Sequence, residues 1–320
     1  MKAIVATTHG GPEVLHLDEV ATPIPGPGEL LIQVAAAGVN FIETYQREGI
    51  YPTPLPFTPG AEAAGIVVTV GEGVEGFAPG DRVATAEASK TYAEYALIPQ
   101  DKALPVPDGL DLTTAAALPL QGMTAHYLMN STFPVQPGQT VLSHAGAGGV
   151  GLLLTQLLKA RGATVITTVS TQEKEALARA AGADHVLGYQ DFAPQVRELT
   201  GGHGVDVVFD GVGQTTFDGS LESLATRGML VLYGAASGPV PAVDPQRLNR
   251  GGSLYLTRPT LGSYLLTPEE RRWRSSEVFE AAANGTLSVR IGGSYPLADA
   301  ADAHRDLQAR ATTGKLVLIP

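Results

Sequence analysis

The stretch that decides the fold is residues 140–158, which read T-V-L-S-H-A-G-A-G-G-V-G-L-L-L-T-Q-L-L. It opens with a predicted apolar strand and closes with the apolar pattern of a helix. Between them Gly146, Gly148 and Gly151 satisfy G-x-G-x-x-G. Glycine suits a tight turn that brings bare backbone and helix-end N–H groups up to a pyrophosphate. The flanking strand and helix favour a dinucleotide-binding turn over a glycine-rich loop at a tight corner.

From about Thr124 to the last quarter of the chain, apolar strands alternate with helical stretches, and the glycine turn follows the first of these strands. Strands are expected at 140–145, 163–169, 185–189, 205–209, 229–233 and 253–257. This alternation is typical of βαβ units, and it predicts a doubly wound parallel sheet of the Rossmann type.

Upstream of the turn the chain reads as a β-rich domain with long loops. Short strands bounded by Pro and Gly clusters are expected at 30–36, 63–70, 82–86 and 92–98. The tail adds helical stretches at 268–284 and 297–310 and a strand at 315–319. The fold class is therefore α/β with two domains, as 320 residues also favour.

The second strand of the series indicates which dinucleotide binds. An Asp or Glu about 20 residues beyond the glycines would bind the ribose 2′-hydroxyl of NAD. Here that strand is followed by Ser170 and, four residues on, Lys174, a hydroxyl and a cation suited to a 2′-phosphate. NADPH is favoured. The alternatives are that Ser170 only caps the helix starting near Gln172, with Lys174 solvated on its first turn, and that Glu173 allows NADH to serve as well.

Composition excludes several classes of protein. The net charge of −11 and the absence of a long basic run argue against nucleic acid as a partner. The chain has no cysteine, which excludes disulfides, thiolate nucleophiles and cysteine-ligated metals. No export signal and no membrane span is apparent, so a cytoplasmic protein is expected. The seven histidines show no i, i+4 pair. His144, beside the turn, is expected to be a hydrogen-bonded residue behind the site, and the alternative is that it touches the cofactor.

Several sequence blocks, in order along nearly the whole chain, resemble the zinc-independent NADPH:quinone reductases related to zeta-crystallin, within the medium-chain dehydrogenase/reductase superfamily. Besides the glycine turn, the blocks are residues 38–45, 59–65, 80–83, 121–127, 169–174, 257–261 and 312–315. The resemblance implies a GroES-like catalytic domain formed by residues 1–123 and 261–320, with a Rossmann domain, residues 124–260, inserted between them. Glu43 departs from the family pattern, in which Asp is common.

The resemblance also bears on metals. In zinc-dependent relatives a zinc-binding Cys falls where this chain has Asn40, and a His falls where it has Ala61. Glu62 is retained, but a lone carboxylate is not a zinc site. No metal is expected, and alcohol dehydrogenation through a zinc-bound alkoxide is excluded.

The expected site residues come from the turn, from the chemistry and from the resemblance. Asn40, Tyr45 and Tyr51 are the expected catalytic residues, because each can donate a hydrogen bond to a developing oxyanion. Their structural alternatives are a helix cap at Phe41, core packing and an exposed loop aromatic, respectively. Asn40 and Tyr45 are expected near the cofactor, and the glycine turn adds Gly146 and Gly151. The resemblance implies further cofactor contacts at Thr124, Gly148, Gly149, Val150, Ser170, Lys174, Tyr189, Tyr233, Gly234, Arg258 and Lys315. For Lys315 the alternative is a surface cation.

The expected function is hydride transfer from NADPH to a quinone without zinc. One alternative keeps the fold and cofactor but reduces the double bond of an alkenal or enone. Another is a non-catalytic NADPH-binding protein with a crystallin-like or RNA-binding role. A homodimer paired through residues 251–258 is also expected, because the family commonly dimerises through the sixth Rossmann strand.

Overall fold

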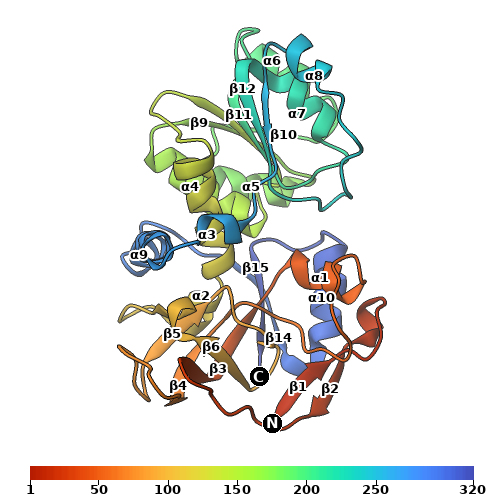
Figure 1. The fold of residues 1–320 in the computed structure, drawn as a ribbon. Coiled ribbons are helices and arrows are strands. Elements are labelled where there is room, and N and C mark those ends of the chain that lie inside the picture. The colour runs from red at the N-terminus through yellow and green to blue at the C-terminus, as the bar shows by residue number, and fades with distance from the viewer. The chain divides into compact units, whose positions relative to one another are not determined.

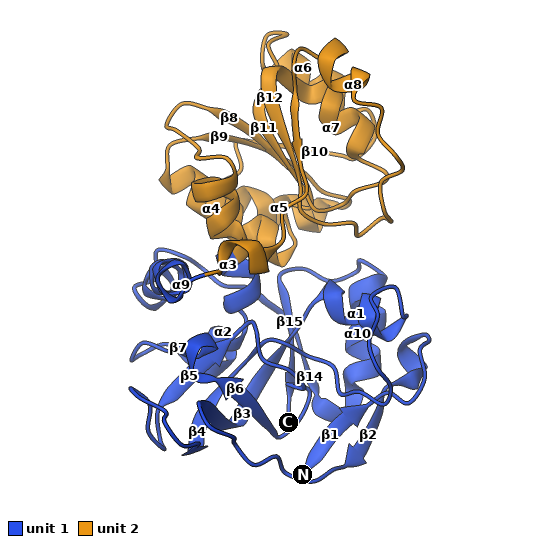
Figure 2. Cartoon of the chain, in the orientation of Figure 1, with its two compact units in different colours: residues 1–123, 267–320 blue, residues 124–266 orange.

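The computed structural model describes residues 1–320 as two compact units (Figure 2). Unit 1 comprises Met1–Met123 and Thr267–Pro320, and unit 2 comprises Thr124–Leu266. The return to unit 1 follows Leu266, whereas the sequence placed it after residue 260. The reason is that the Tyr264 ring stacks on Tyr127 of unit 2, with ring centroids 4.3 Å apart. Residues 261–266 are therefore part of unit 2.

Unit 1 is built on a seven-stranded, mostly antiparallel sheet with the order β14-β15-β3-β4-β5-β7, in which β6 also pairs with β3 (Figure 1). Its strands are β3 (Glu29–Val39), β4 (Ala63–Val70), β5 (Arg82–Thr85), β6 (Tyr95–Pro99), β7 (Leu104–Pro105), β14 (Ile291–Pro296) and β15 (Lys315–Ile319). β1 (Lys2–Val5) and β2 (His16–Glu19) form a separate antiparallel pair. The long strand β3 pairs with β4, β6 and β15, and it is buried along most of its length because it is central to the unit.

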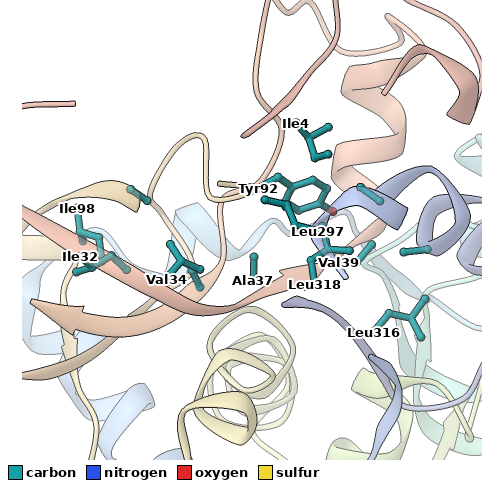
Figure 3. Packing of buried hydrophobic residues seen from close by; sticks show 14 of the residues in the cluster. Ile4, Ile32, Val34, Ala37, Val39, Tyr92, Ile98, Leu297, Leu316 and Leu318 are labelled. Carbon is teal, nitrogen blue, oxygen red and sulfur yellow. The ribbon is translucent and has the colours of Figure 1, made fainter. Parts of the chain in front are cut away.

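The core of unit 1 lies between the sheet and the N-terminal strand (Figure 3). Ile4, Ile32, Leu318 and Tyr92 belong to this cluster, and each is fully buried. The sequence predicted a strand over 92–98, but the observed strand, β6, begins at Tyr95. The carbonyl of Tyr92 instead accepts the N–H of Ile4 at 2.8 Å, so this segment bonds to β1 before the chain joins β3.

The helices of unit 1 lie around its sheet. They are α1 (Phe41–Arg47), α2 (Leu112–Ala116), α9 (Pro268–Ala283), α10 (Ala300–Gln308) and most of α3 (Pro119–Tyr127). Thr267 caps α9, its hydroxyl accepting the Glu270 N–H at 3.2 Å, and Pro268 occupies the first helical position, where a missing N–H costs nothing. α10 contacts both β15 and α1.

Unit 2 is the expected doubly wound sheet, with six parallel strands in the order β10-β9-β8-β11-β12-β13. The strands are β8 (Thr140–Ser143), β9 (Thr164–Thr168), β10 (His185–Leu187), β11 (Val205–Asp210), β12 (Leu224–Leu232) and β13 (Tyr255–Thr257). The chain moves outward from β8 to β10 on one side and then returns to the centre for β11. The α/β class and the Rossmann arrangement are confirmed.

Helical crossovers join these parallel strands. They are α4 (Gly149–Ala160), α5 (Gln172–Ala180), α6 (Phe192–Leu199), α7 (Phe217–Ser223) and α8 (Gln246–Arg250), of which α4 contacts α5 and α6 contacts α7. Phe192, Val196 and Phe217 pack into one core cluster with buried strand residues such as Val208 and Leu230. No helix of the chain is long and apolar enough to cross a bilayer.

Candidate active site

The glycine turn follows β8 at the centre of the unit 2 sheet. The N–H of Gly146 donates to the carbonyl of Thr168 at 3.0 Å, and that of Gly148 donates to Ala145 at 2.9 Å. A Cβ at Gly146 would overlap the Thr167 hydroxyl, and one at Gly151 would overlap the carbonyl of Ala145. These two glycines are therefore needed for close packing of the turn itself.

The amino end of α4 has no side-chain cap. Gly148 is its N-cap and has no side chain to accept the first-turn N–H groups. The N–H groups of Gly149, Val150 and Gly151 have no carbonyl partner within the helix, because the first turn of any helix lacks one. First-turn N–H groups and the positive end of the helix dipole together suit a pyrophosphate.

Other sequence-predicted residues of unit 2 line the same edge of the sheet. Ser170, Tyr189, Tyr233 and Arg258 directly or closely follow β9, β10, β12 and β13. The carboxyl ends of parallel strands share one edge, so the fold brings these positions to the side that carries the glycine turn. The strand order reverses between β8 and β11, which is where ligands bind in open α/β sheets. Gly234 follows Tyr233, and Thr124 is buried in α3.

Two residues of the 2′-phosphate prediction, Ser170 and Lys174, lie just after the second strand. The cap of α5 is Thr171, whose hydroxyl accepts the Lys174 N–H at 3.3 Å. Ser170 is therefore not the cap, and its side chain is exposed beside the end of β9. Lys174 is half-buried on the first turn of α5.

A chain of four buried side chains supports the glycine turn from inside the sheet. His144 bonds to Thr168 Oγ1 at 2.8 Å through Nδ1 and to Ser220 Oγ at 2.9 Å through Nε2, and Ser220 donates to Asp210 Oδ2 at 2.8 Å. Because the hydroxyl proton of Ser220 goes to Asp210, Nε2 of His144 must be the donor and Nδ1 the acceptor. Burial lowers the pKa of His144, although Asp210 opposes this, so the ring is neutral. The expectation of a hydrogen-bonded His144 agrees with this geometry.

Asp210 closes the chain of bonds and shapes the next loop. Its carboxylate accepts the N–H groups of Val212 at 2.8 Å and Gly213 at 2.9 Å, and the hydroxyl of Thr216. The carboxylate is fully buried without a cation, and these bonds stabilise it instead. Tyr189 lies beside this network, its ring 6.3 Å from that of His144.

In unit 1 the candidate site is centred on Asn40, Glu62 and Lys315. The Lys315 ammonium bonds to Asn40 Oδ1 at 2.5 Å and forms an ion pair with the Glu62 carboxylate. Asn40 Nδ2 donates to Glu62 Oε2 at 2.9 Å, and the Leu120 N–H donates to Glu62 Oε1 at 2.7 Å. Lys315 is 1% exposed, which contradicts the alternative of a surface cation.

Glu43 is a second buried carboxyl group at this site. Its Oε2 accepts the backbone N–H of Asn40 at 2.8 Å, which fixes the start of α1, while its Oε1 has no hydrogen-bond partner. Burial raises the pKa of the Glu43 carboxyl from 4.5 to about 7, with Lys315 and the hydrogen bond opposing the rise and Glu62 adding to it. Glu43 therefore gains or loses its proton near neutral pH.

Two tyrosines predicted from the sequence, one on α1 and one shortly after it, contact each other. The rings of Tyr45 and Tyr51 meet edge to face with centroids 5.5 Å apart, and the Tyr51 N–H donates to the carbonyl of Tyr45 at 3.2 Å. Phe41, one turn before Tyr45 on α1, has its ring 6.4 Å away. Tyr45 is half-buried and Tyr51 is 42% exposed, so both offer aromatic surface.

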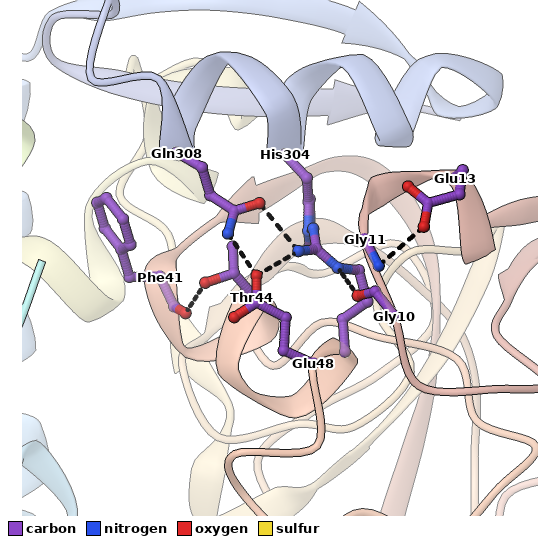
Figure 4. Close-up of polar contacts among 9 residues, drawn as sticks. Gly10, Gly11, Glu13, Phe41, Thr44, Glu48, His304 and Gln308 are labelled. Carbon is purple, nitrogen blue, oxygen red and sulfur yellow. Dashed lines mark hydrogen bonds and ion pairs between the residues drawn. The ribbon is translucent and has the colours of Figure 1, made fainter. Parts of the chain in front are cut away.

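The carboxyl end of α1 is anchored by a buried arginine. Arg47 donates to the carbonyl of Gly10 at 3.0 Å, to Gln308 Oε1 at 2.9 Å and to Glu48 at 2.7 Å, and its Nη1 lies 3.1 Å from His304 Nδ1. Figure 4 shows Gln308 and His304 reaching from one helix, α10, toward Glu48 and Gly10. The helix that carries Glu43 and Tyr45 is thus tied to α10 and to the N-terminal segment.

Comparison with known proteins agrees with this architecture. Residues 26–108 match the alcohol dehydrogenase GroES-like domain, and residues 149–277 match the zinc-binding dehydrogenase family. Over its whole length the chain is 45% identical to a quinone oxidoreductase of Pseudomonas aeruginosa, covering 99% of that protein. The chain belongs to the quinone oxidoreductases of the medium-chain dehydrogenase/reductase superfamily.

Two further relatives concern cofactor and substrate. A mycobacterial protein solved in complex with NADPH is 54% identical, with each chain fully covered and a TM-score of 0.98. A 2-haloacrylate reductase of a Burkholderia species is 43% identical over 99% of this chain and 98% of its own.

The structure also shows which side chains occupy the positions where the resemblance would put zinc ligands. No group of three or more His, Asp or Glu side chains in the chain is placed to hold a metal ion. Asn40, which the sequence resemblance places where zinc-dependent relatives have a zinc-binding Cys, is bonded through its amide to an ammonium and a carboxylate.

Sequence reasoning missed Asp210 and the role of Glu62. Each is a carboxylate within or beside an apolar strand, Asp210 after V-V-F and Glu62 before A-A-G-I-V-V. An acidic residue in such a run is rarely buried without a partner, and that signal was available. The identity of the partners, Ser220 and Lys315, was not.

Proposed function

We propose that this chain is a zinc-independent, NADPH-dependent quinone reductase. The observation that carries the proposal is the amino end of α4, which no side chain caps and which follows the glycine turn at the point where the strand order reverses. The full-length similarity to a quinone oxidoreductase, and to a protein that binds NADPH, supports the acceptor and the cofactor.

Unit 2 holds the cofactor in this proposal. The first-turn N–H groups of Gly149, Val150 and Gly151 bind the pyrophosphate. Ser170 and Lys174 bind the 2′-phosphate, because a hydroxyl and a cation favour that group over a free hydroxyl. Tyr189, Tyr233, Gly234 and Arg258 line the same edge and complete the set of contacts.

Unit 1 supplies the groups that handle the acceptor. NADPH supplies a hydride when it is bound. Asn40, Tyr45 and Tyr51 donate hydrogen bonds to the acceptor oxygen on which negative charge develops. None of these groups has to act as a strong acid, since the oxygens of a reduced quinone can take protons from solvent.

The test is steady-state oxidation of NADPH and of NADH with phenanthrenequinone, a simple benzoquinone and a medium-chain enal, before and after dialysis against a chelator. We expect turnover with NADPH and a quinone that the chelator does not lower. Failure of every quinone to oxidise NADPH, despite tight NADPH binding, would refute the proposal and favour a non-catalytic role.

A second candidate is reduction of an activated carbon–carbon double bond, as an alkenal or enone reductase. The similarity to a 2-haloacrylate reductase favours it, because that name denotes reduction of such a bond. A higher kcat/KM for the enal than for every quinone would select this function.

We also propose that the chain forms a homodimer and is cytoplasmic. β13 is the last strand of the unit 2 sheet, and Tyr255 on it is 57% exposed, so its free edge is open to pairing with a second copy. Sedimentation that gives only the 33.2 kDa species would refute the dimer. Cell fractionation tests the location.

A further inference from the structure

The ion pair between Lys315 and Glu62 is assembled by the ends of three adjacent strands of unit 1. β15 pairs with β3 so that Leu316 lies opposite Val39, which brings Lys315 next to Asn40. β3 pairs with β4 so that Ala37 lies opposite Ala63, and the Gly38 N–H donates to the Glu62 carbonyl at 3.0 Å. The register of the sheet thus determines which side chains meet.

Strand β3 also leaves space for the pair. A Cβ at Gly38 would overlap the Glu62 carboxylate and lie 2.8 Å from Lys315 Cε. Gly38 does not have a positive φ, so the backbone does not require glycine there. The missing side chain makes room for the ion pair.

The pair and Asn40 form a closed ring of hydrogen bonds. The ammonium faces the amide oxygen of Asn40 and the carboxylate faces its nitrogen, so reversing the amide would break both contacts. Nδ2 carries two hydrogens, and Glu62 accepts one. The orientation of the amide is therefore fixed, with one N–H left for another acceptor.

The ammonium also polarises the amide. A cation on the amide oxygen draws electron density from the nitrogen, which makes the remaining N–H a stronger donor in an environment of low dielectric constant. Asn40, Glu62 and Lys315 are 5%, 0% and 1% exposed, so water screens little of this effect. A buried ion pair is weak as a source of stability, and a well-packed apolar pair can replace it without loss.

We propose that Lys315 is a positioning residue for reduction, which with Glu62 holds the Asn40 amide so that its free N–H meets the oxyanion of the acceptor. The inference rests on the proposed function, in which Asn40 is the donor to that oxygen. It assigns Lys315 a role that differs from the cofactor contact expected from sequence, because two groups of its own chain already bind its ammonium.

The test compares the wild type with Lys315→Met, with the double variant Lys315→Met/Glu62→Gln and with the control Lys2→Met, whose side chain is exposed on β1 of the same unit. The single variant leaves a buried carboxylate without its cation and is expected to be less stable. The double variant keeps the cluster neutral, so it separates loss of positioning from loss of folding. Thermal unfolding verifies that it is folded.

Three quantities are measured on each variant: kcat with a quinone, the dissociation constant of NADPH, and the affinity in the presence of NADP⁺ for 4-nitrophenolate, a stable oxyanion, against neutral 4-nitrotoluene. In the double variant we expect kcat to fall about 100-fold, as for loss of one oxyanion donor, and NADPH affinity to stay unchanged. Phenolate affinity should fall about tenfold with nitrotoluene affinity unchanged, which is the size of one charge-assisted hydrogen bond.

Contrary results are equally specific. An NADPH affinity that weakens as much as kcat falls would make Lys315 a cofactor ligand, and unchanged kcat and phenolate affinity would make the ion pair purely structural. A wild type with no preference for phenolate over nitrotoluene would also overturn the inference. If the wild type reduces no quinone, the proposed function fails, while the phenolate measurement still decides the role of Lys315.

Discussion

Glu43→Gln is expected to change how the stability of unit 1 depends on pH. The carboxyl is fully buried, and its pKa rises from 4.5 to about 7 on folding. Below pH 4.5 both the folded and the unfolded chain hold the proton, so this group adds no penalty. As the pH rises from 4.5 to about 7, the unfolded chain releases the proton first, and the folded state becomes less stable relative to the unfolded state.

The size of the effect follows from the shift. Each pKa unit corresponds to about 1.4 kcal/mol, so the whole rise is worth about 3 kcal/mol of lost unfolding free energy above pH 7. Glutamine cannot ionise, and its amide oxygen can still accept the Asn40 N–H. The unfolding free energy of the variant minus that of the wild type should therefore increase by about 3 kcal/mol from acidic to neutral pH.

The assay is urea unfolding at a series of pH values, followed by the fluorescence of Trp273. This is the only tryptophan of the chain and lies on α9 in unit 1, so its signal reports the unit that contains Glu43. The control is Glu19→Gln on β2 of the same unit, where the side chain is exposed and the difference should not vary with pH. A difference for Glu43→Gln that is equally flat would refute the reasoning.

Three other substitutions test separate parts of the structure. Lys174→Ala should raise the KM for NADPH about tenfold and leave that for NADH nearly unchanged, since it removes one charged contact to the 2′-phosphate; equal effects would mean that Lys174 is only a helix residue. Gly151→Val should abolish NADPH binding in an equilibrium titration, because its Cβ would overlap the Ala145 carbonyl and push the turn open; normal affinity would contradict the tight turn. Arg47→Met should lower unfolding free energy by about 3 kcal/mol by leaving Gly10 and Gln308 without their donor, whereas a change under about 1 kcal/mol would show that the network is dispensable.

The sequence by itself determined the features that depend on near neighbours in the chain. The glycine turn is encoded within residues 143–151, and each βαβ unit is a local pattern of apolar spacing. The parallel order then places Ser170, Tyr189, Tyr233 and Arg258 at one edge, because every strand of the series ends there. The exclusion of thiolate chemistry needed only the absence of cysteine.

Tertiary structure alone decided the contacts between distant residues. Lys315 meets Asn40 and Glu62 because β15 and β4 both pair with β3, and no local pattern records that register. Likewise, the pKa of Glu43 depends on how much water the folded chain removes from it and on the charges of Lys315 and Glu62. Burial and electrostatic interactions depend on distances in space. A carboxyl group that looks ordinary in sequence can therefore be buried in the fold and have a pKa near neutral pH.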